Sequence, residues 1–170
     1  TILMLLRPDS YKAALLAEID KAERKALKTG IPALFRLNGT SDIDYTDIIK
    51  ERPKSLFYDY SKVLSNVRKN TLANYDLTYS ASMYSKQSRA AFKKAVKAGH
   101  RIAVAFNTKG LASDELQINH TLASFDKTDL RHLDGAVIGS LTRKGSSKAD
   151  RAADNLQANS FFVTTANLVA

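Results

Sequence analysis

The chain has 170 residues, of which 44% are hydrophobic and 25% charged, with seven Gly and three Pro. These values predict an ordered globular protein of one domain, residues 1–170, and they exclude a disordered chain. The longest apolar runs, such as TILMLL at residues 1–6, are too short to cross a membrane, so no membrane partner is expected.

Cysteine is absent, which excludes disulfides, thiolate nucleophiles and thiolate-bound metals and suits a cytoplasmic protein. The net charge is +9, from 26 Lys and Arg against 17 Asp and Glu. This charge favours polyanions, chiefly nucleic acid, as partners, although solubility explains it equally well. His100, His120 and His132 lack the spacing of metal ligands, so no metal site is predicted.

The first half of the chain alternates between helix and strand patterns. The run at residues 1–6 could be a strand or the end of a helix. Ser10–Gly30 is a strong amphipathic helix, capped by Asp9 or Ser10 and ended by Gly30. A strand at residues 33–39 (ALFRLNG) and a short helix at 46–52, which Pro53 ends, come next.

The same alternation continues to the end. We expect a strand at Ser55–Ser61, a helix at 62–70 with Ser61 as its cap, a strand at Tyr75–Ala81, a helix at Ser85–Gly99, and strands at Arg101–Asn107, Gly135–Thr142 and Ser160–Thr165, with a less regular stretch at Leu111–Leu133. Such alternation predicts an α/β fold with a mainly parallel sheet whose strands are covered on both faces. A complete eight-unit barrel needs roughly 200–250 residues. The alternatives are therefore a partial or truncated TIM-like barrel, an open sheet, or a fragment of a larger barrel.

Polar residues follow each well-defined strand at its carboxyl end, where parallel sheets bind ligands. They are Asn38, Thr40, Ser41 and Asp42 after the first strand, Asp59, Tyr60 and Lys62 after the second, then Ser80, Ser82, Asn107, Lys109, Thr142, Arg143 and Lys144. Each also has a structural explanation; for example, Ser41 to Asp44 fits a capping box, and Asn38-Gly39 is a common turn. Their coincidence at one edge favours a ligand site.

Arg36 interrupts the apolar strand at residues 33–39. Arg36 and Asn38 have the same parity, so we expect their side chains to share a face and to point into the mouth of the sheet. A buried arginine needs a carboxylate partner, which Asp42 or Asp59 would supply. We therefore expect these four residues and Ser80 to converge.

One part of the chain is uniformly basic, because Leu77 to Ser113 holds seven Lys or Arg and no Asp or Glu. On the helix from Ser85, one stripe carries Lys86, Arg89, Lys93 and Lys97, whereas Ala91, Phe92, Ala95 and Val96 face away. Both a solvated outer face and a face for nucleic-acid phosphates explain this pattern. No sequence-reading motif accompanies the stripe, so any nucleic-acid binding should be non-specific.

Six segments of the chain are distinctive. They are FRLNGTSDI (Phe35–Ile43), FYDYSKVL (Phe57–Leu64), YDLTYS (Tyr75–Ser80), IAVAF (Ile102–Phe106), TDLRHLD (Thr128–Asp134) and VIGSLTRKG (Val137–Gly145). In this order they resemble the gene product 88 family of phages and plasmids, over nearly all of the chain from about Ser10 onward. The resemblance implies a phage or plasmid setting, with the host-cell cytoplasm as the location, and no defined activity.

The resemblance also singles out individual positions. They are Arg36, Asn38, Gly39, Thr40, Ser41 and Asp42, then Asp59, Tyr60 and Lys62, then Ser80, Asp129, Arg131 and Asp134. Longer relatives carry a cysteine-rich segment upstream of the first helix, suggestive of a metal or iron–sulfur site. This chain has no cysteine, so the resemblance does not extend to cluster-dependent chemistry.

The leading interpretation is a phage- or plasmid-type α/β protein that binds a small anionic or phosphate-bearing ligand at the carboxyl edge of its sheet. Phosphoester or nucleotide chemistry is the first class to test, with Asp42 and Asp59 as the catalytic candidates. The expected ligand contacts are Arg36, Asn38, Thr40, Ser41, Tyr60, Lys62, Ser80, Asp129, Arg131 and Lys144.

Two other interpretations stay open. A non-enzymatic accessory protein would bind nucleic acid or a host protein through Lys86, Arg89, Lys93 and Lys97. An interaction module would use its polar strand ends only to lock the fold. The sequence identifies neither a reaction nor a cofactor, nor an oligomeric state.

Overall fold

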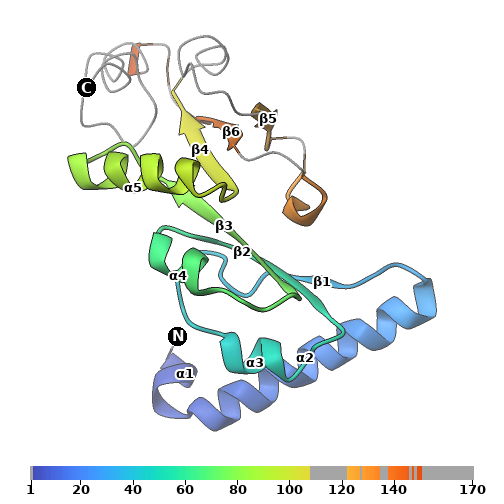
Figure 1. The fold of residues 1–170 in the computed structure, drawn as a ribbon. Coiled ribbons are helices and arrows are strands. Elements are labelled where there is room, and N and C mark those ends of the chain that lie inside the picture. The colour runs from blue at the N-terminus through green and yellow to red at the C-terminus, as the bar shows by residue number, and fades with distance from the viewer. Residues whose placement is uncertain are drawn as a thin grey trace. The chain divides into compact units, whose positions relative to one another are not determined.

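The computed structural model describes residues 2–107, 122–126, 128–134, 138–145, 147 and 149–150 (Figure 1). The chain forms two compact units. Unit 1 comprises the described residues up to Asp59 together with Thr71–Asp76, and unit 2 comprises Tyr60–Asn70 and the described residues from Leu77 onward. The expected strand at Ser160–Thr165 lies outside the described residues, as do Lys109 and His120.

Helices and strands alternate along the chain as the sequence predicts. In order they are α1 (Ile2–Leu6), α2 (Pro8–Thr29), β1 (Leu34–Phe35), α3 (Thr46–Lys50), β2 (Leu56–Ser61), α4 (Leu64–Lys69), β3 (Tyr75–Ala81), α5 (Lys86–Lys97), β4 (Ile102–Phe106), β5 (Leu122–Ser124), a 3-10 turn at Arg131–Leu133, and β6 (Ile138–Thr142). The run at residues 1–6, which the sequence left undecided, contributes a short helix.

The six strands belong to one sheet with the order β1-β2-β3-β4-β6-β5. The pairs β1–β2, β3–β4, β4–β6 and β5–β6 are parallel, which confirms the predicted α/β fold with a parallel sheet. Strands β1 and β5 stand at the two ends of this order, so the described strands form an open sheet and do not close into a barrel.

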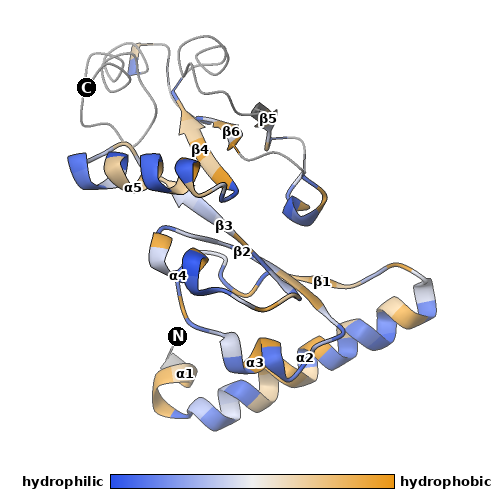
Figure 2. Cartoon of the chain, viewed as in Figure 1, coloured by the Kyte–Doolittle hydropathy of each residue, from blue (hydrophilic) through white to orange (hydrophobic). Residues whose placement is uncertain are grey.

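Helix α2 supplies the longest element of unit 1. Its amphipathic pattern is visible along the ribbon in Figure 2. Pro8 lies in the first turn, where a backbone N–H has no intrahelical acceptor, and no side chain caps this end. The predicted caps Asp9 and Ser10 are therefore wrong, because the helix begins before them. The other end is as predicted: Gly30 is left-handed (φ 69°), and its N–H donates to the carbonyl of Ala26 at 2.9 Å.

The core of unit 1 forms where α2 and α3 pack against β2. Ile19 of α2, Ile49 of α3 and Phe57 of β2 are almost fully buried in it. The rings of Phe35 and Phe57 stack across β1 and β2, with centroids 5.3 Å apart. Burial of this apolar surface holds β1 beside the first part of β2 in unit 1.

Helix α5 covers one face of the unit 2 strands. Ser85 caps it as predicted: the Ser85 hydroxyl accepts from the Ser88 N–H at 3.1 Å, and the Ser88 hydroxyl accepts from the Ser85 N–H at 2.9 Å. The expectation that Ser61 caps α4 is wrong. That helix begins at Leu64, and Ser61 instead accepts the N–H of Val63 at 3.0 Å in the turn that leads to it.

The unit 2 strands have two unlike faces. The face against α5 is apolar and carries Leu77, Tyr79, Ala81, Ile102, Val104, Phe106 and Ile138. Strand alternation puts Thr78, Ser80, Ala103, Ala105, Gly139 and Leu141 on the opposite side, which we call the polar face, and Asn107 and Arg143 directly follow β4 and β6. Thr78, Ala103 and Gly139 on this second face are buried, as expected for strands covered on both faces, but small and polar residues rather than large apolar ones make up most of it.

Candidate functional site

Asp59 is the central polar residue of unit 1. It lies in β2 and is fully buried, and its carboxylate accepts the backbone N–H of Asn38 at 2.8 Å and the hydroxyl of Tyr75 at 3.2 Å. Burial raises the pKa of Asp59, and the hydrogen bonds and the positive charge of Arg36 oppose this shift. Because both oxygens accept hydrogen bonds from the protein, this geometry favours a structural role over direct contact with a ligand.

Asn38 holds the loop that follows β1. Its side-chain amide donates to the carbonyl of Ile43 at 2.9 Å, and its oxygen accepts from the Ser41 hydroxyl at 2.7 Å and from the Ile43 N–H at 3.0 Å. Asn38 is 4% exposed. Its hydrogen bonds thus fix the course of residues 38–43 and leave Thr40, Ser41 and Asp42 exposed on the loop.

Arg36 does not occupy the position expected from parity. Strand β1 ends at Phe35, so alternation no longer determines where the next side chains point; Arg36 is exposed, whereas Asn38 is buried. The expectation of a buried arginine is wrong. The charge of Arg36 still acts on Asp59, and the charge of Asp42 helps raise the pKa of Tyr75. Of the five residues expected to converge, Asn38 and Asp59 are hydrogen-bonded, Arg36 and Asp42 act through their charges on Asp59 and Tyr75, and Ser80 belongs to unit 2.

The predicted capping box at Ser41 to Asp44 is replaced by a simpler contact. The carboxylate of Asp44 accepts the N–H of Thr46 at 2.9 Å, and the hydrogen bonds from Thr46 hold the pKa of Asp44 below its usual value. Ser41 instead donates to Asn38. The helix α3 thus begins from an Asp turn rather than from a reciprocal cap.

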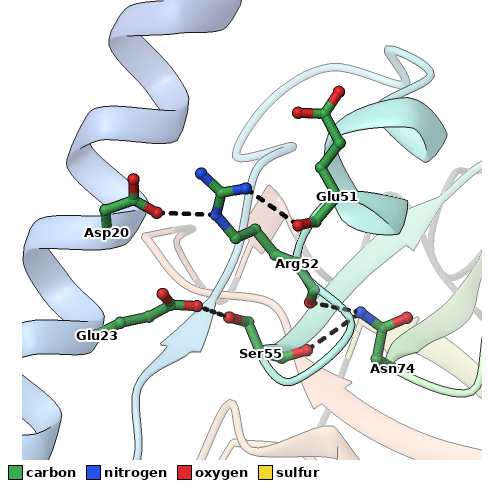
Figure 3. A network of polar contacts seen from close by, with 6 residues as sticks. All are labelled: Asp20, Glu23, Glu51, Arg52, Ser55 and Asn74. Atoms are coloured by element: carbon green, nitrogen blue, oxygen red, sulfur yellow. Dashed lines mark hydrogen bonds and ion pairs between the residues drawn. The ribbon is translucent and has the colours of Figure 1, made fainter.

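A second polar network in unit 1 joins α2 to the turn before β2 (Figure 3). The Arg52 guanidinium donates to Asp20 at 2.8 Å, and the Ser55 hydroxyl donates to Glu23. The side-chain amide of Asn74 donates to the carbonyls of Ile49, Arg52 and Ser55 at 3.3, 3.0 and 3.2 Å. Sequence reasoning missed this network because its partners lie 19–32 residues apart and no local pattern connects them.

The polar face of unit 2 contains a row of small residues. Ser80, Ala103, Gly139 and Ala123 are in register across β3, β4, β6 and β5. A Cβ atom at Gly139 would collide with the ring of Phe125, so this ring lies directly on the row. Only glycine permits that approach, and the ring in turn supports Arg131.

Arg131 is fully buried above the ring of Phe125, with its guanidinium carbon 3.8 Å from the ring centroid. Its Nη1 lies 2.9 Å from a carboxylate oxygen of Asp134, an ion pair without hydrogen-bond alignment, and its Nη2 donates to the Phe125 carbonyl at 3.5 Å. Among the described residues, the Nε of Arg131 and the hydroxyl of the fully buried Thr78 have no hydrogen-bond partner.

Other predicted residues flank the polar face. Tyr60, at the end of β2, donates to the carboxylate of Asp129 at 3.3 Å, which joins two of the distinctive segments. The Arg143 guanidinium donates to the fully buried Asn107 at 3.0 Å, and the Arg143 N–H extends the ladder to Phe106. Ser80 is half-buried. Lys62 and Lys144 are exposed.

The basic stripe of α5 is largely where the sequence predicts it. Lys86, Lys93 and Lys97 are exposed, and Phe92 and Ala95 are buried on the opposite side. Arg89 differs: it is half-buried, and its guanidinium donates to the carbonyl of Met83 at 3.0 Å. Lys94 is exposed beside the stripe and was not among the predicted residues.

Two further properties concern partners. Within the described ranges, no group of three or more His, Asp or Glu side chains is arranged to hold a metal ion. None of the described helices combines the length and the apolar character that a membrane-spanning helix needs.

Comparison with known proteins gives one match. The chain matches the model of a protein family, gene product 88, over residues 1–157. Searches of curated proteins and of solved structures gave no match. The matched range contains all six distinctive segments and every described residue. The chain therefore belongs to the gene product 88 family.

Proposed function

We propose that the protein binds a small phosphate- or carboxylate-bearing ligand on the polar face of unit 2. The observation that carries this proposal is the Arg131 guanidinium, a fully buried charge whose Nε has no hydrogen-bond partner among the described residues. A buried guanidinium normally has its donors satisfied, because an unsatisfied buried donor costs about 1–3 kcal/mol, and more when it is charged. One ion pair and one long hydrogen bond leave this requirement only partly met.

The surroundings of Arg131 favour a polar ligand. Ser80 is half-buried on this face, whereas Ala103 is buried and the Phe125 ring covers Gly139, so a ligand would approach the face beside Ser80. The hydroxyls of Ser80 and Thr78 are hydrogen-bonding groups on the same face. A site for an apolar ligand would need several large hydrophobic side chains here, and among the described residues this side offers Leu141 and the Phe125 ring that stacks with Arg131.

A second guanidinium, which belongs to Arg143 at the carboxyl ends of β4 and β6, supports an anionic ligand in particular. The Arg143 side chain is held at one end by the backbone ladder to Phe106 and at the other by the Asn107 amide oxygen. Such a fixed guanidinium presents its donors in the geometry that carboxylates and phosphates accept. A phosphoester-bearing small molecule such as a nucleotide is therefore the ligand class to test first.

Titration of the full chain with inorganic phosphate, AMP and succinate, followed by ¹⁵N-¹H NMR at constant ionic strength, tests this proposal. We expect saturable shifts at the described ends of β4 and β6 and in residues 128–134. Arg143→Gln should weaken binding about tenfold or more, because it removes a charged hydrogen-bond donor worth about 1.5–3 kcal/mol. Arg24→Gln, at an exposed position on α2, is the matched control and should leave affinity unchanged.

Arg131→Lys tests the buried guanidinium, and its thermal unfolding is measured in parallel to establish that it folds. A folded Arg131→Lys protein with undiminished affinity would overturn the role of Arg131. Absence of shifts with all three ligands, or shifts confined to α4 and α5, would overturn the proposed site.

A further inference from the structure

A groove lies between α4 and α5 on the surface of unit 2. It has a volume of about 340 Å³. Its lining consists of Leu64, Ser65 and Arg68 from α4 and Gln87, Ala90, Ala91 and Lys94 from α5. Arg68 and Lys94 are exposed and supply one cation from each helix, and none of the seven lining residues is acidic. We call this feature the basic groove.

The helices around the basic groove extend its positive charge. Lys86, Lys93 and Lys97 are exposed on α5, and Lys69 is exposed at the end of α4. The segment Leu77 to Ser113 contains no Asp or Glu, so no carboxylate from α5 or its flanking residues neutralises these lysines. Solvated helix faces usually mix charges of both signs, whereas a uniform cationic surface attracts polyanions.

The cationic helix is also held firmly on the sheet. Its start is fixed by the reciprocal cap of Ser85 and Ser88, and the Arg89 side chain ties it to the Met83 carbonyl. Phe92 and Ala95 anchor it in the apolar core. The lysines therefore project from a rigid element, about 18 Å long for 12 residues, rather than from a loop.

We propose that the basic groove and the exposed lysines of α5 bind the phosphodiester backbone of nucleic acid. At 3.4 Å per nucleotide along one strand, a helix of this length can follow on the order of five phosphates. Ser65 and Gln87 add uncharged donors that suit phosphate oxygens. No aromatic side chain lines the basic groove, so binding depends on phosphates and is independent of base sequence.

An acidic protein surface is the other polyanion to consider. Protein interfaces generally bury large aromatic or aliphatic side chains at their centre. The basic groove offers Leu64, which is half-buried, and two alanines. The small apolar content and the row of cations favour a regular array of phosphates.

Fluorescence anisotropy with a labelled 20-base-pair duplex and its single strand tests the proposal at several salt concentrations. The test variant is Lys86→Gln, Lys93→Gln, Lys94→Gln and Lys97→Gln combined. If all four lysines contact duplex phosphates, the slope of log affinity against log salt becomes shallower by roughly 3–4. A shuffled duplex should bind with the same affinity as the original.

The control variant carries the same loss of charge in unit 1: Lys21→Gln, Lys25→Gln, Lys28→Gln and Lys50→Gln combined, all at exposed positions. It should keep the parental slope. The proposal would be overturned if the parent and the test variant had equal slopes, or if the slope of the control variant became shallower by as much as that of the test variant. It would also be overturned if the parent did not bind at low salt. Tighter binding to poly-glutamate than to either nucleic acid would overturn it in favour of an acidic protein partner.

Discussion

The carboxylate of Asp59 accepts the backbone N–H of Asn38 at 2.8 Å, and this contact joins the end of β2 to the loop after β1. The N–H of Asn38 is directed to this side chain rather than to a neighbouring strand, and the ladder between β1 and β2 ends three residues earlier, at Phe35.

The first prediction concerns the pH dependence of stability. Burial raises the pKa of Asp59 above its ordinary value of 3.8, so the folded state holds this proton more tightly than the unfolded state. The contribution of Asp59 to stability is therefore full below pH 3.8 and is lost as pH rises through the folded-state pKa. Asp59→Asn replaces the carboxyl group with an amide that does not titrate. The free energy of unfolding of the variant minus that of the parent should therefore increase with pH in this window, by at most about 1.4 kcal/mol per pH unit.

Urea denaturation of parent and variant between pH 3.5 and 7 measures this difference. Asp9→Asn, an exposed position, controls for the loss of one negative charge and should follow the parent curve. Parallel curves for Asp59→Asn and the parent would contradict the prediction.

The second prediction concerns the contact of Phe125 with β6. Gly139→Ala places a methyl group against the Phe125 ring. Such overpacking should lower the free energy of unfolding by about 1–3 kcal/mol. Thermal or chemical unfolding checks this loss. Gly39→Ala is the matched control, because a Cβ there meets no atom within 4 Å. In the double variant with Phe125→Ala, the cost of Gly139→Ala should largely disappear; strictly additive losses would contradict the assigned contact.

The third prediction concerns Asn74, whose amide donates to the carbonyls of Arg52 and Ser55 (Figure 3) and to that of Ile49, around the turn before β2. Asn74→Ala leaves these carbonyls without this donor and should lower the free energy of unfolding by about 1–3 kcal/mol. Asn74→Asp, which places a second acceptor beside them, should be at least as destabilising. Urea denaturation measures both, and a stability for Asn74→Asp equal to the parent would count against the assigned hydrogen bonds.

The fourth prediction concerns the start of α5. Ser85→Ala removes the side-chain acceptor for the Ser88 N–H and should destabilise the protein by about 1 kcal/mol. Ser85→Asp keeps an acceptor and should restore most of the loss. Ser10→Ala, at an exposed position inside α2, serves as the control in the same unfolding experiment. An unchanged free energy of unfolding for Ser85→Ala would show that the cap contributes little to stability.

The elements that could be predicted have local causes. The bounds of β3 agree with the sequence prediction, and Gly30 and Ser85 end and begin their helices as expected, because a hydrophobic period and one terminal residue suffice to define them. Arg36 could not be placed this way. Its parity argument needs a continuous strand, but β1 ends at Phe35, and the loop that follows is held by a hydrogen bond from Asn38 to Asp59, 21 residues away.

The candidate sites show the same limit. The lysines of α5 follow from helical periodicity alone. The position of Arg131 depends instead on a phenylalanine six residues earlier and on a glycine in another strand that lets the ring approach. No local sequence pattern predicts that an arginine stacks on a phenylalanine ring in this way. The sequence therefore identified Arg131 as a residue of interest but did not predict its position in the fold.

Unit 1 is assembled from two separate stretches of the chain, which has a consequence for its synthesis and for its dissection. Asn74 and Tyr75, which hold the turn before β2 and the Asp59 carboxylate, come after α4, a helix of unit 2. During translation, the part ending at Asp59 is synthesised before these two residues are added. A fragment cut at that residue should be less cooperative than the parent in unfolding. Any excised form of unit 1 must therefore carry the polypeptide through at least Asp76.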